Sequence, residues 1–307
     1  MRILLWHVHG SWTTAFVHGA HEYAVPVVPG RGPDGLGLPT TYVWPEEVSE
    51  LSPAQIGEED WDLVVLQRPH ELALAEEWLG RRLSRDIPAV YVEHNAPQGR
   101  VNEMRHPCAE RPGIGVVHVT HFNRLFWDCG AAPTHVIEHG IVDPGHRYSG
   151  ALERVAVVIN EPERRGRVTG TDLVPVLADG APVDLFGMGA WELPHDALHD
   201  EMARRRVYLH PIRWTSLGLS LLEAMQLGMP VVALATTEVP RAVPPEAGIV
   251  SADLDELRAG VRALLDEPAR AREMGAAARA AALSRYSLER FHSDWDALLR
   301  DRVGVLA

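Results

Sequence analysis

Short apolar runs recur along this chain, and the stretches between them are long enough to hold helices. Runs of this length without alternating polar residues are typical of strands buried on both faces, as in a parallel sheet between two helix layers. They lie at residues 3–6, 63–66, 89–92, 116–119 and 134–137, and then at 155–159, 183–186, 207–209, 231–234 and 248–250. Two such series predict an α/β chain with two Rossmann-like, doubly wound parallel sheets.

A polar, turn-rich stretch at residues 143–150 separates the two series. Its Asp, Pro, Gly and Ser residues favour turns, and they come shortly before the strand expected at 155–159. We therefore predict an N-terminal domain over 1–148 and a C-terminal domain over 149–307. A terminal helix of the second domain is expected after Ser287, a candidate N-cap. Its apolar face consists of Leu288, Phe291, Trp295, Leu298 and Leu299.

Composition narrows the range of partners. The formal net charge is −13, with arginine as the only basic residue besides histidine, and a negative protein lacks the field that attracts nucleic acids. No apolar run approaches the roughly 20 residues that span a bilayer. Residues 1–6 form too short an apolar run for a signal peptide. We expect a cytoplasmic protein with no nucleic-acid partner and no transmembrane segment.

The most informative segment is residues 210–233. It reads as the end of a strand, a loop containing Gly218, a helix that ends at Gly228, and a buried strand. Glu223 lies among apolar residues of that helix, where a carboxylate is unfavourable unless hydrogen-bond donors such as ligand hydroxyls meet it. The alternative is that Glu223 lies on the solvated side of the helix.

This segment resembles the signature of retaining glycosyltransferases of the GT-B fold, chiefly glycosyltransferase family 4. The matching residues are Pro211, Gly218, Leu219, Glu223, Ala224, Met225, Gly228, Pro230, Val231, Val232 and Ala233. The resemblance implies two Rossmann-like domains facing across a cleft. It places a nucleotide-sugar donor on the C-terminal domain and the acceptor on the N-terminal domain.

The resemblance also implies roles for individual residues. Glu223 would bind the ribose of the donor, and the preceding loop, Ser216, Leu217, Gly218 and Leu219, would line the donor site. The family has a first glutamate near the donor sugar, and this chain has Thr215 at that position and Ser216 at the glycine that follows it. A threonine hydroxyl exchanges hydrogen bonds but carries no negative charge.

Two further segments correspond to the donor side of the family. Residues 161–166 fall where the family holds the donor diphosphate, so the role of its lysine carries over to Arg165, with Arg164 beside it. The family's upstream arginine has no counterpart here, since valines occupy residues 157–158. Gly187 corresponds to the Gly-x-Gly turn near the nucleotide. The alternative for the arginines is a solvated loop without a ligand.

Acceptor-side residues are expected after the first strand, at His7, His9, Ser11 and Trp12. Gly10 in the same turn allows close approach of the backbone to donor phosphate, so we assign it to the donor site. Alternating histidines at a strand end raise the question of a metal site, but no third ligand is evident and we expect no metal.

His94 directly follows the run at 89–92, where the family often has a histidine in its active-site cleft. We expect it to contact the transferred sugar or the acceptor, and the alternative is a structural histidine bonded to backbone. His118 and His121 are weaker candidates in a similar position.

Together these features predict a hexosyltransferase-like enzyme that moves a sugar from a nucleoside diphosphate sugar to the hydroxyl of a small-molecule or glycan acceptor. Arg165 would stabilise the charge that develops on the leaving phosphate, with His94 and Thr215 as further catalytic candidates. Retention of configuration is expected, with no cofactor and no metal. Two alternatives remain open: a nucleotide-sugar-binding accessory protein without transfer activity, and a sugar-nucleotide epimerase on the same scaffold.

Overall fold

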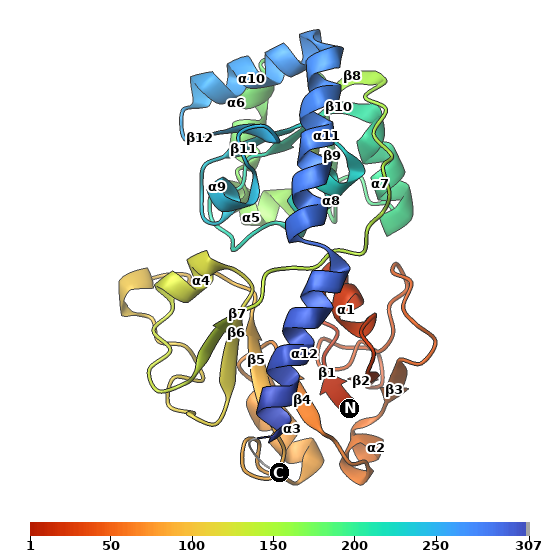
Figure 1. Ribbon diagram of the computed structural model, residues 1–307, viewed down its shortest axis with the longest axis vertical. Helices are drawn as coiled ribbons and strands as arrows, with labels where there is room; N and C mark the ends of the chain where they lie inside the picture. Colours follow the sequence, from red (N-terminus) through yellow and green to blue (C-terminus); the bar gives the residue numbers. More distant parts are fainter. Residues whose placement is uncertain (305–307) are drawn as a thin grey trace. The chain divides into compact units, whose positions relative to one another are not determined.

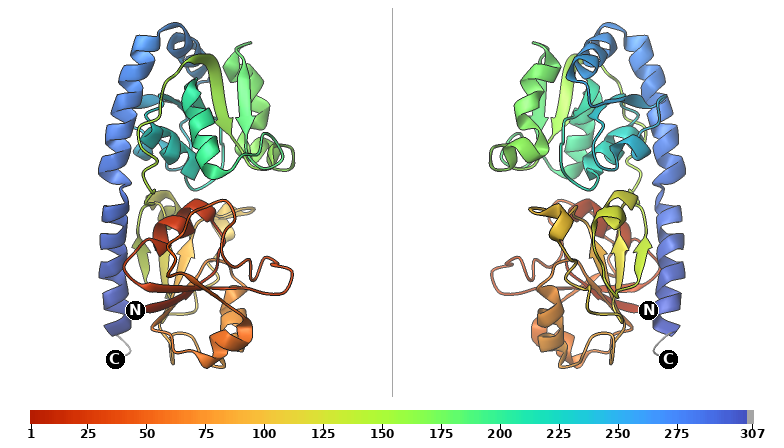
Figure 2. Two further views of the ribbon diagram at one scale, coloured as in Figure 1. Left: turned by 90° about the vertical axis from the view of Figure 1, so that its right-hand side faces the viewer. Right: turned by 90° about the vertical axis from the view of Figure 1, so that its left-hand side faces the viewer.

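The computed structural model describes residues 1–304 and divides into two compact units (Figure 1). The first comprises Met1–Val142 together with the chain from Leu288 onward, and the second is Asp143–Ser287. Each unit is built on one parallel sheet with helices packed against it (Figures 1 and 2). The predicted fold class, α/β with two doubly wound sheets, is confirmed.

The sheet of the first unit has seven strands in the order β3-β2-β1-β4-β5-β6-β7, and every pairing is parallel. The chain winds outward from β1 to β3 and then returns to β4 on the other side of β1. This reversal makes the carboxyl ends of β1 and β4 the switch point of the sheet. The strands are β1 Arg2–Leu5, β2 Glu22–Pro26, β3 Ser49–Leu51, β4 Leu63–Leu66, β5 Ala89–Glu93, β6 Gly115–His118 and β7 Thr134–Val136.

The helices of the first unit connect these strands and end with a long C-terminal helix. They are α1 Gly10–Val17, α2 Pro53–Glu58, α3 Glu71–Leu79, α4 His121–Phe126 and α12 Leu288–Gly304, with a 3-10 turn η1 at Val101–Glu103. A cluster of apolar side chains fills the core between sheet and helices, and β4 is buried at all four residues. Each fully buried Val or Leu stabilises the fold by about 1.5–3 kcal/mol relative to an exposed one.

The second unit has a five-stranded parallel sheet in the order β12-β11-β10-β8-β9, so its switch point lies at the carboxyl ends of β8 and β10. Its strands are β8 Leu152–Val158, β9 Val183–Phe186, β10 Arg205–His210, β11 Val231–Leu234 and β12 Gly248–Ser251. Its helices are α5 Pro162–Thr169, α6 Val174–Ala178, α7 His195–Arg204, α8 Leu219–Leu227, α9 Val239–Ala242, α10 Leu254–Asp266 and α11 Pro268–Arg285, with a 3-10 turn η2 at Thr171–Leu173.

The terminal helix α12 packs on the first unit, which corrects the predicted assignment of this helix to the C-terminal domain. The Trp295 ring lies 5.0 Å from that of Phe16 and 6.0 Å from that of Trp12, both on α1. His292 Nε2 lies 2.8 Å from the Ala15 carbonyl oxygen. The aromatic face of α1 therefore supplies the apolar partner that the helix needs.

The boundary between the units falls at Asp143 and not at residue 149. The backbone N–H groups of Arg147 and Tyr148 both donate to the Leu227 carbonyl, and the Tyr148 hydroxyl donates to the Arg206 carbonyl at 2.8 Å. These bonds attach the turn-rich stretch to the second unit, so the new unit begins before its first strand does.

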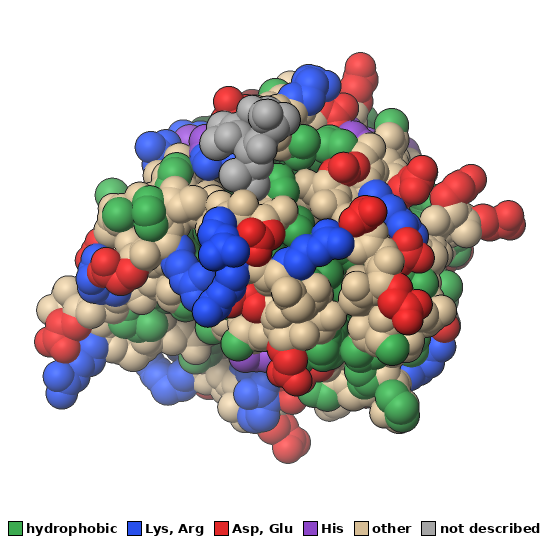
Figure 3. Space-filling model, turned by 90° about the horizontal axis from the view of Figure 1, so that it is seen from below, with side chains coloured by type: hydrophobic (Ala, Val, Ile, Leu, Met, Phe, Trp, Pro, Cys, Tyr) green, Lys and Arg blue, Asp and Glu red, His purple; other side chains and the backbone are tan. Residues whose placement is uncertain are grey.

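On the face shown in Figure 3, arginine and acidic side chains are interspersed and do not gather into one field. None of the helices in the described part of the chain has both the length and the hydropathy needed to cross a membrane.

Candidate functional site

The predicted donor residues of the second unit come together at the switch point of its sheet. The segment after β8 leads into α5, and the segment after β10 leads into α8. The Arg213 and Trp214 N–H groups, in the loop after β10, donate to the Val168 carbonyl of α5 at 3.0 and 3.2 Å. Gly170 follows α5 with a φ of +73°, and a Cβ there would overlap the Pro211 carbonyl. Two loops that are distant in sequence are thus fixed against each other.

The Gly187 turn lies at the same carboxyl end of the second sheet. Gly187 has a φ of +118°, and a Cβ built on it would lie 2.5 Å from the Ile159 carbonyl oxygen, so the position requires glycine. The Asn160 side-chain oxygen accepts a hydrogen bond from Met188 N–H at 2.9 Å, and Glu161 N–H donates to the Met188 carbonyl at 2.7 Å. The turn after β9 therefore lies beside the segment that carries the arginines.

The three arginines of α5 are in different environments. Arg164 is exposed and forms an ion pair with Glu161, and Arg167 is exposed and lies 3.4 Å from Asp172. Arg165 is half-buried, and its guanidinium makes no hydrogen bond or ion pair with any residue of 1–304. Burial, followed by the nearby Arg164 charge, lowers the pKa of Arg165 from its usual value. A half-buried cation without a protein acceptor is suited to an anionic ligand.

The loop before α8 is closely packed. Ser216 and Leu217 are buried, and Thr215 is half-buried. Gly218 is the N-cap of α8, and a Cβ there would lie 2.5 Å from His210 Cε1, so a larger residue would displace the buried histidine. The α8 N-terminus is therefore held at a fixed place at the end of β10.

Glu223 is buried within α8 at 4% exposure, which excludes the solvated alternative. Its Oε1 lies 3.1 Å from His195 Nε2, and its Oε2 lies 3.6 Å from His199 Nε2. Burial by itself raises the pKa of the Glu223 carboxyl, but the hydrogen bond with His195 and the charges of the two nearby imidazoles outweigh it and hold that pKa well below its usual range. The carboxylate is therefore ionised and already engaged by imidazoles.

Sequence reasoning missed these two histidines. They are four residues apart at the start of α7, a spacing that places both imidazoles on one face of a helix. That spacing was readable in the sequence, but its link to Glu223 depends on the packing of α7 against α8.

In the first unit, the residues after β1 form a compact turn into α1. The His7 Nδ1 atom lies 3.1 Å from the Gly37 carbonyl oxygen, and a Cβ on Gly10 would overlap the Tyr42 ring. Ser11 Oγ lies 3.4 Å from the Tyr42 hydroxyl. The turn is thus closed by the loop that follows β2.

Trp12 is fully buried and packs on Phe16 and on α12, so the structure corrects its assignment as an acceptor-side residue. An aromatic side chain near a strand end serves the core as readily as a ligand, and here the terminal helix covers it. His7 and His9 also have separate partners, since the His7 ring lies 4.8 Å from Trp44 and the His9 ring 4.1 Å from His94.

His94 follows β5 and is buried at 8% exposure. Its Nε2 lies 2.9 Å from Gln67 Oε1, and Gln67 Nε2 donates to the Trp6 carbonyl at 2.6 Å. Burial, with His9 and His139 nearby, lowers the pKa of His94 well below its usual value, so this histidine is neutral. A side-chain amide, and not the backbone, therefore fixes the ring at the switch point of the first sheet.

The weaker candidates have no shared site. His118 is fully buried with its Nε2 3.5 Å from Cys129 Sγ, and His121 is exposed at the start of α4. Within residues 1–304, the only group of three His, Cys, Asp or Glu side chains whose ligand atoms lie within 4.8 Å of one another is His195, His199 and Glu223.

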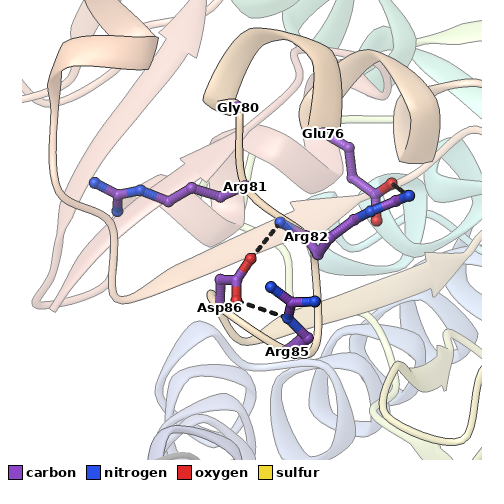
Figure 4. Close-up of a pocket in the computed structure, with 6 residues that line it drawn as sticks. All are labelled: Glu76, Gly80, Arg81, Arg82, Arg85 and Asp86. Atoms are coloured by element: carbon purple, nitrogen blue, oxygen red, sulfur yellow. Dashed lines mark hydrogen bonds and ion pairs between the residues drawn. The ribbon is translucent and has the colours of Figure 1, made fainter.

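A surface pocket of about 380 Å³ lies elsewhere in the first unit (Figure 4). Its lining residues are Glu76, Gly80, Arg81, Arg82, Arg85 and Asp86. Arg82 pairs with Glu76 at 2.7 Å, and Arg85 pairs with Asp86 at 3.0 Å. The segment runs from the end of α3 to the start of β5, which is the amino-terminal edge of the sheet, whereas ligands of such sheets bind at the carboxyl edge.

Comparisons with known proteins agree with this geometry. A model of the family described as glycosyl transferases group 1 matches residues 190–281. A GDP-mannose-dependent monoacylated alpha-(1-6)-phosphatidylinositol monomannoside mannosyltransferase of Corynebacterium glutamicum is 31% identical over 146 residues, which are 47% of this chain and 34% of that protein. The alignment thus spans about a third of the relative's length.

Solved structures show the same fold over nearly the whole chain. Sucrose-phosphate synthase of Thermosynechococcus elongatus superposes with a TM-score of 0.70 at 14% identity, covering 98% of both chains. HepE of Anabaena, solved in complex with UDP-glucose, superposes with a TM-score of 0.63 at 14% identity, covering 98% of this chain and 100% of its own. This chain has the fold of the GT-B glycosyltransferases, and residues 190–281 of its second unit are similar to the glycosyl transferases group 1 family.

Proposed function

We propose that this protein transfers a sugar from a nucleoside diphosphate sugar to a hydroxyl-bearing acceptor. The observation that carries the proposal is Arg165, a half-buried guanidinium without a protein acceptor among residues 1–304, beside the Gly187 turn and the loop that precedes α8. Support comes from the HepE structure with UDP-glucose and from the mannosyltransferase relative, which is named for its use of GDP-mannose.

The geometry of the second unit supports the following proposed donor roles. Arg165 binds the diphosphate, with Arg164 and the Gly187 turn beside it. Glu223 accepts hydrogen bonds from ribose hydroxyls once its carboxylate oxygens are released from their contacts with His195 and His199. Ser216, Leu217, Gly218 and Leu219 line the nucleotide side of the site.

In the transfer itself, the bond between the anomeric carbon and the diphosphate oxygen breaks, and a bond forms from that carbon to the acceptor oxygen. The acceptor hydroxyl passes its proton to the departing diphosphate oxygen, on which negative charge develops as the bond breaks. Arg165 stabilises that charge with a fixed positive group, so the step requires neither a metal nor a cofactor. Thr215 is assigned to the donor sugar and His94 to the transferred sugar or acceptor, and the product keeps the donor's anomeric configuration.

A nucleotide-sugar-binding protein without transfer activity is the second candidate. The neutral Thr215 at the position of the family's first glutamate, together with Val157 and Val158 in place of an upstream arginine, favours it. Both changes remove charge near the donor while leaving Arg165 and Glu223 in place.

Product analysis separates the two candidates. The chain is incubated with the nucleotide sugar that it binds and with a panel of sugar, polyol and glycan acceptors, and mass spectrometry follows the mass of one added hexose. We expect one acceptor class to gain a hexose while free nucleoside diphosphate accumulates. Return of the donor unchanged with every acceptor, and without hydrolysis, would contradict transfer and support the binding protein.

A further inference from the structure

Two histidines and a glutamate converge in the second unit. His195 and His199 lie on one face of α7, with ring centroids 4.2 Å apart, and Glu223 reaches them from α8. One ligand atom from each of the three side chains, a ring nitrogen of each histidine and a carboxylate oxygen of Glu223, lies within 4.8 Å of the other two. Imidazole and carboxylate are both common ligands of zinc and related divalent metals.

The spacing of these atoms fits a metal ion. Two ligands bound at roughly 2.1 Å to one tetrahedral ion lie about 3.4 Å apart. The distances here are 3.1 Å from His195 Nε2 to Glu223 Oε1 and 3.6 Å from His199 Nε2 to Glu223 Oε2, which bracket that value. The second distance is too long for a hydrogen bond.

Burial adds a separate argument. His199 is 3% exposed, and its Nε2 is a buried polar atom without a hydrogen-bond partner among the described residues. A buried polar nitrogen without a hydrogen bond is unfavourable. A cation coordinated by this nitrogen and by the adjacent Glu223 carboxylate would remove that penalty. The His195 side chain is 26% exposed, which gives an ion a route to the site from solvent.

We propose that His195, His199 and Glu223 form a binding site for a divalent transition-metal ion of the zinc class. Three protein ligands leave a fourth position for water or a ligand oxygen. Mg²⁺ and Ca²⁺ prefer oxygen ligands, so a set with two imidazole nitrogens discriminates against them. The site follows from the side chains alone and is independent of the proposed function.

A consequence for the donor does rest on the proposed function. The carboxylate that would coordinate the metal is the one assigned to the ribose hydroxyls. Zinc bound there occupies lone pairs of the Glu223 carboxylate that would otherwise accept hydrogen bonds from the ribose hydroxyls, so zinc and nucleotide compete for this side chain. Transfer itself needs no metal, and zinc acts as an inhibitor of donor binding.

The test is a titration of chelator-treated chain with Zn²⁺ alone, by calorimetry and by metal analysis after gel filtration. We expect one zinc per chain and no comparable binding of Mg²⁺. His195→Gln and His199→Ala should each weaken zinc binding by more than about 100-fold, beyond the 10- to 100-fold effect of residues that only orient a ligand. His146→Ala, which removes an exposed histidine of the same unit, should leave zinc binding unchanged.

Circular dichroism of each variant checks that the fold is retained, and His195→Gln at the more exposed ligand keeps the test valid if His199→Ala fails to fold. The proposal is overturned if the wild-type chain binds no zinc, or if His195→Gln binds zinc as tightly as His146→Ala does. The first outcome would identify the three residues as an imidazole–carboxylate ion pair only. Since no nucleotide is present, neither result bears on whether the chain binds a sugar donor.

Discussion

Replacing Arg165 by alanine tests the assignment of the donor site, because this arginine has an unusual combination of burial and missing partners. A hydrogen bond to a charged group contributes about 1.5–3 kcal/mol, and 1.4 kcal/mol corresponds to about tenfold in affinity. Loss of the guanidinium should therefore raise the Kd for the nucleoside diphosphate by about 10- to 150-fold. Isothermal calorimetry measures this directly.

The same substitution should leave the fold nearly as stable as before. The Arg165 guanidinium makes no hydrogen bond or ion pair with any residue of 1–304, so no protein partner is left unsatisfied. We expect the free energy of unfolding to change by less than about 1 kcal/mol, close to the value for substitutions away from packed or ion-paired sites. Chemical denaturation of the variant checks this expectation.

Two other arginines provide matched controls. Arg270 is exposed at the start of α11 and lies 3.5 Å from Glu267, so Arg270→Ala should change neither affinity nor stability. Arg205 is buried, bonds Asp184 at 2.7 Å and lies over the Phe186 ring, so Arg205→Ala should destabilise the second unit by about 3–5 kcal/mol. An Arg165→Ala variant whose affinity matches that of Arg270→Ala, or whose stability falls like that of Arg205→Ala, would refute the reasoning.

Three further substitutions test the fold. Gly187→Ala should destabilise the second unit by about 1–3 kcal/mol, because φ is +118° and the new Cβ would meet the Ile159 carbonyl; an unchanged denaturation midpoint would count against this. Trp295→Ala should destabilise the first unit by about 3–5 kcal/mol through loss of its packing on Trp12. An unchanged free energy of unfolding would show that α12 does not stabilise that unit. Burial lowers the pKa of His210 to about 4, so below pH 6.5 this histidine binds a proton in the unfolded chain and not in the native chain, and its share of the stability falls by about 2 kcal/mol between pH 7 and pH 5. His210→Gln should reduce the pH dependence of stability by that amount, and an equally steep slope in the variant would show that His210 does not contribute to it.

The buried strands were predictable because a strand covered on both faces must be apolar throughout. All ten apolar runs correspond to strands, as at β4 Leu63–Leu66 and β11 Val231–Leu234. The strands β2 Glu22–Pro26 and β3 Ser49–Leu51 were not predicted, because a proline interrupts the apolar stretch of β2 and because β3 is short and partly exposed. The pairing of β2 with β1, and of β3 with β2, stabilises two strands that their own sequences do not indicate.

The placement of α12 shows why domain limits are harder to predict than strands. Its apolar face was evident from the spacing of Phe291 and Trp295, but a face alone does not identify its partner. The partner is the aromatic surface of α1, whose Trp12 was itself interpreted as a ligand contact. Both errors have one cause, because each side chain was assigned without knowledge of the other.

Some residues of the candidate site could be proposed from the sequence and others could not. The loop before α8, the arginines of α5 and the Gly187 turn could be proposed as donor residues from the sequence because a family pattern fixes their register. His195 and His199 were not, because the family pattern does not include them. Their role as candidate ligands depends on their short distances to Glu223, which lies on a different helix, and only the folded structure gives those distances.

The measurement that tests the central claim most directly is the binding of nucleoside diphosphates to the chelator-treated chain. Calorimetric titrations with UDP, GDP, ADP and TDP compare the affinities of the wild-type chain and of Arg165→Ala. The account predicts that at least one of the four binds with a stoichiometry of one per chain, without added metal, and that the affinity falls in the variant. Failure of all four to bind, or binding that Arg165→Ala leaves unchanged, would contradict the assignment of a nucleotide-sugar site to the second unit.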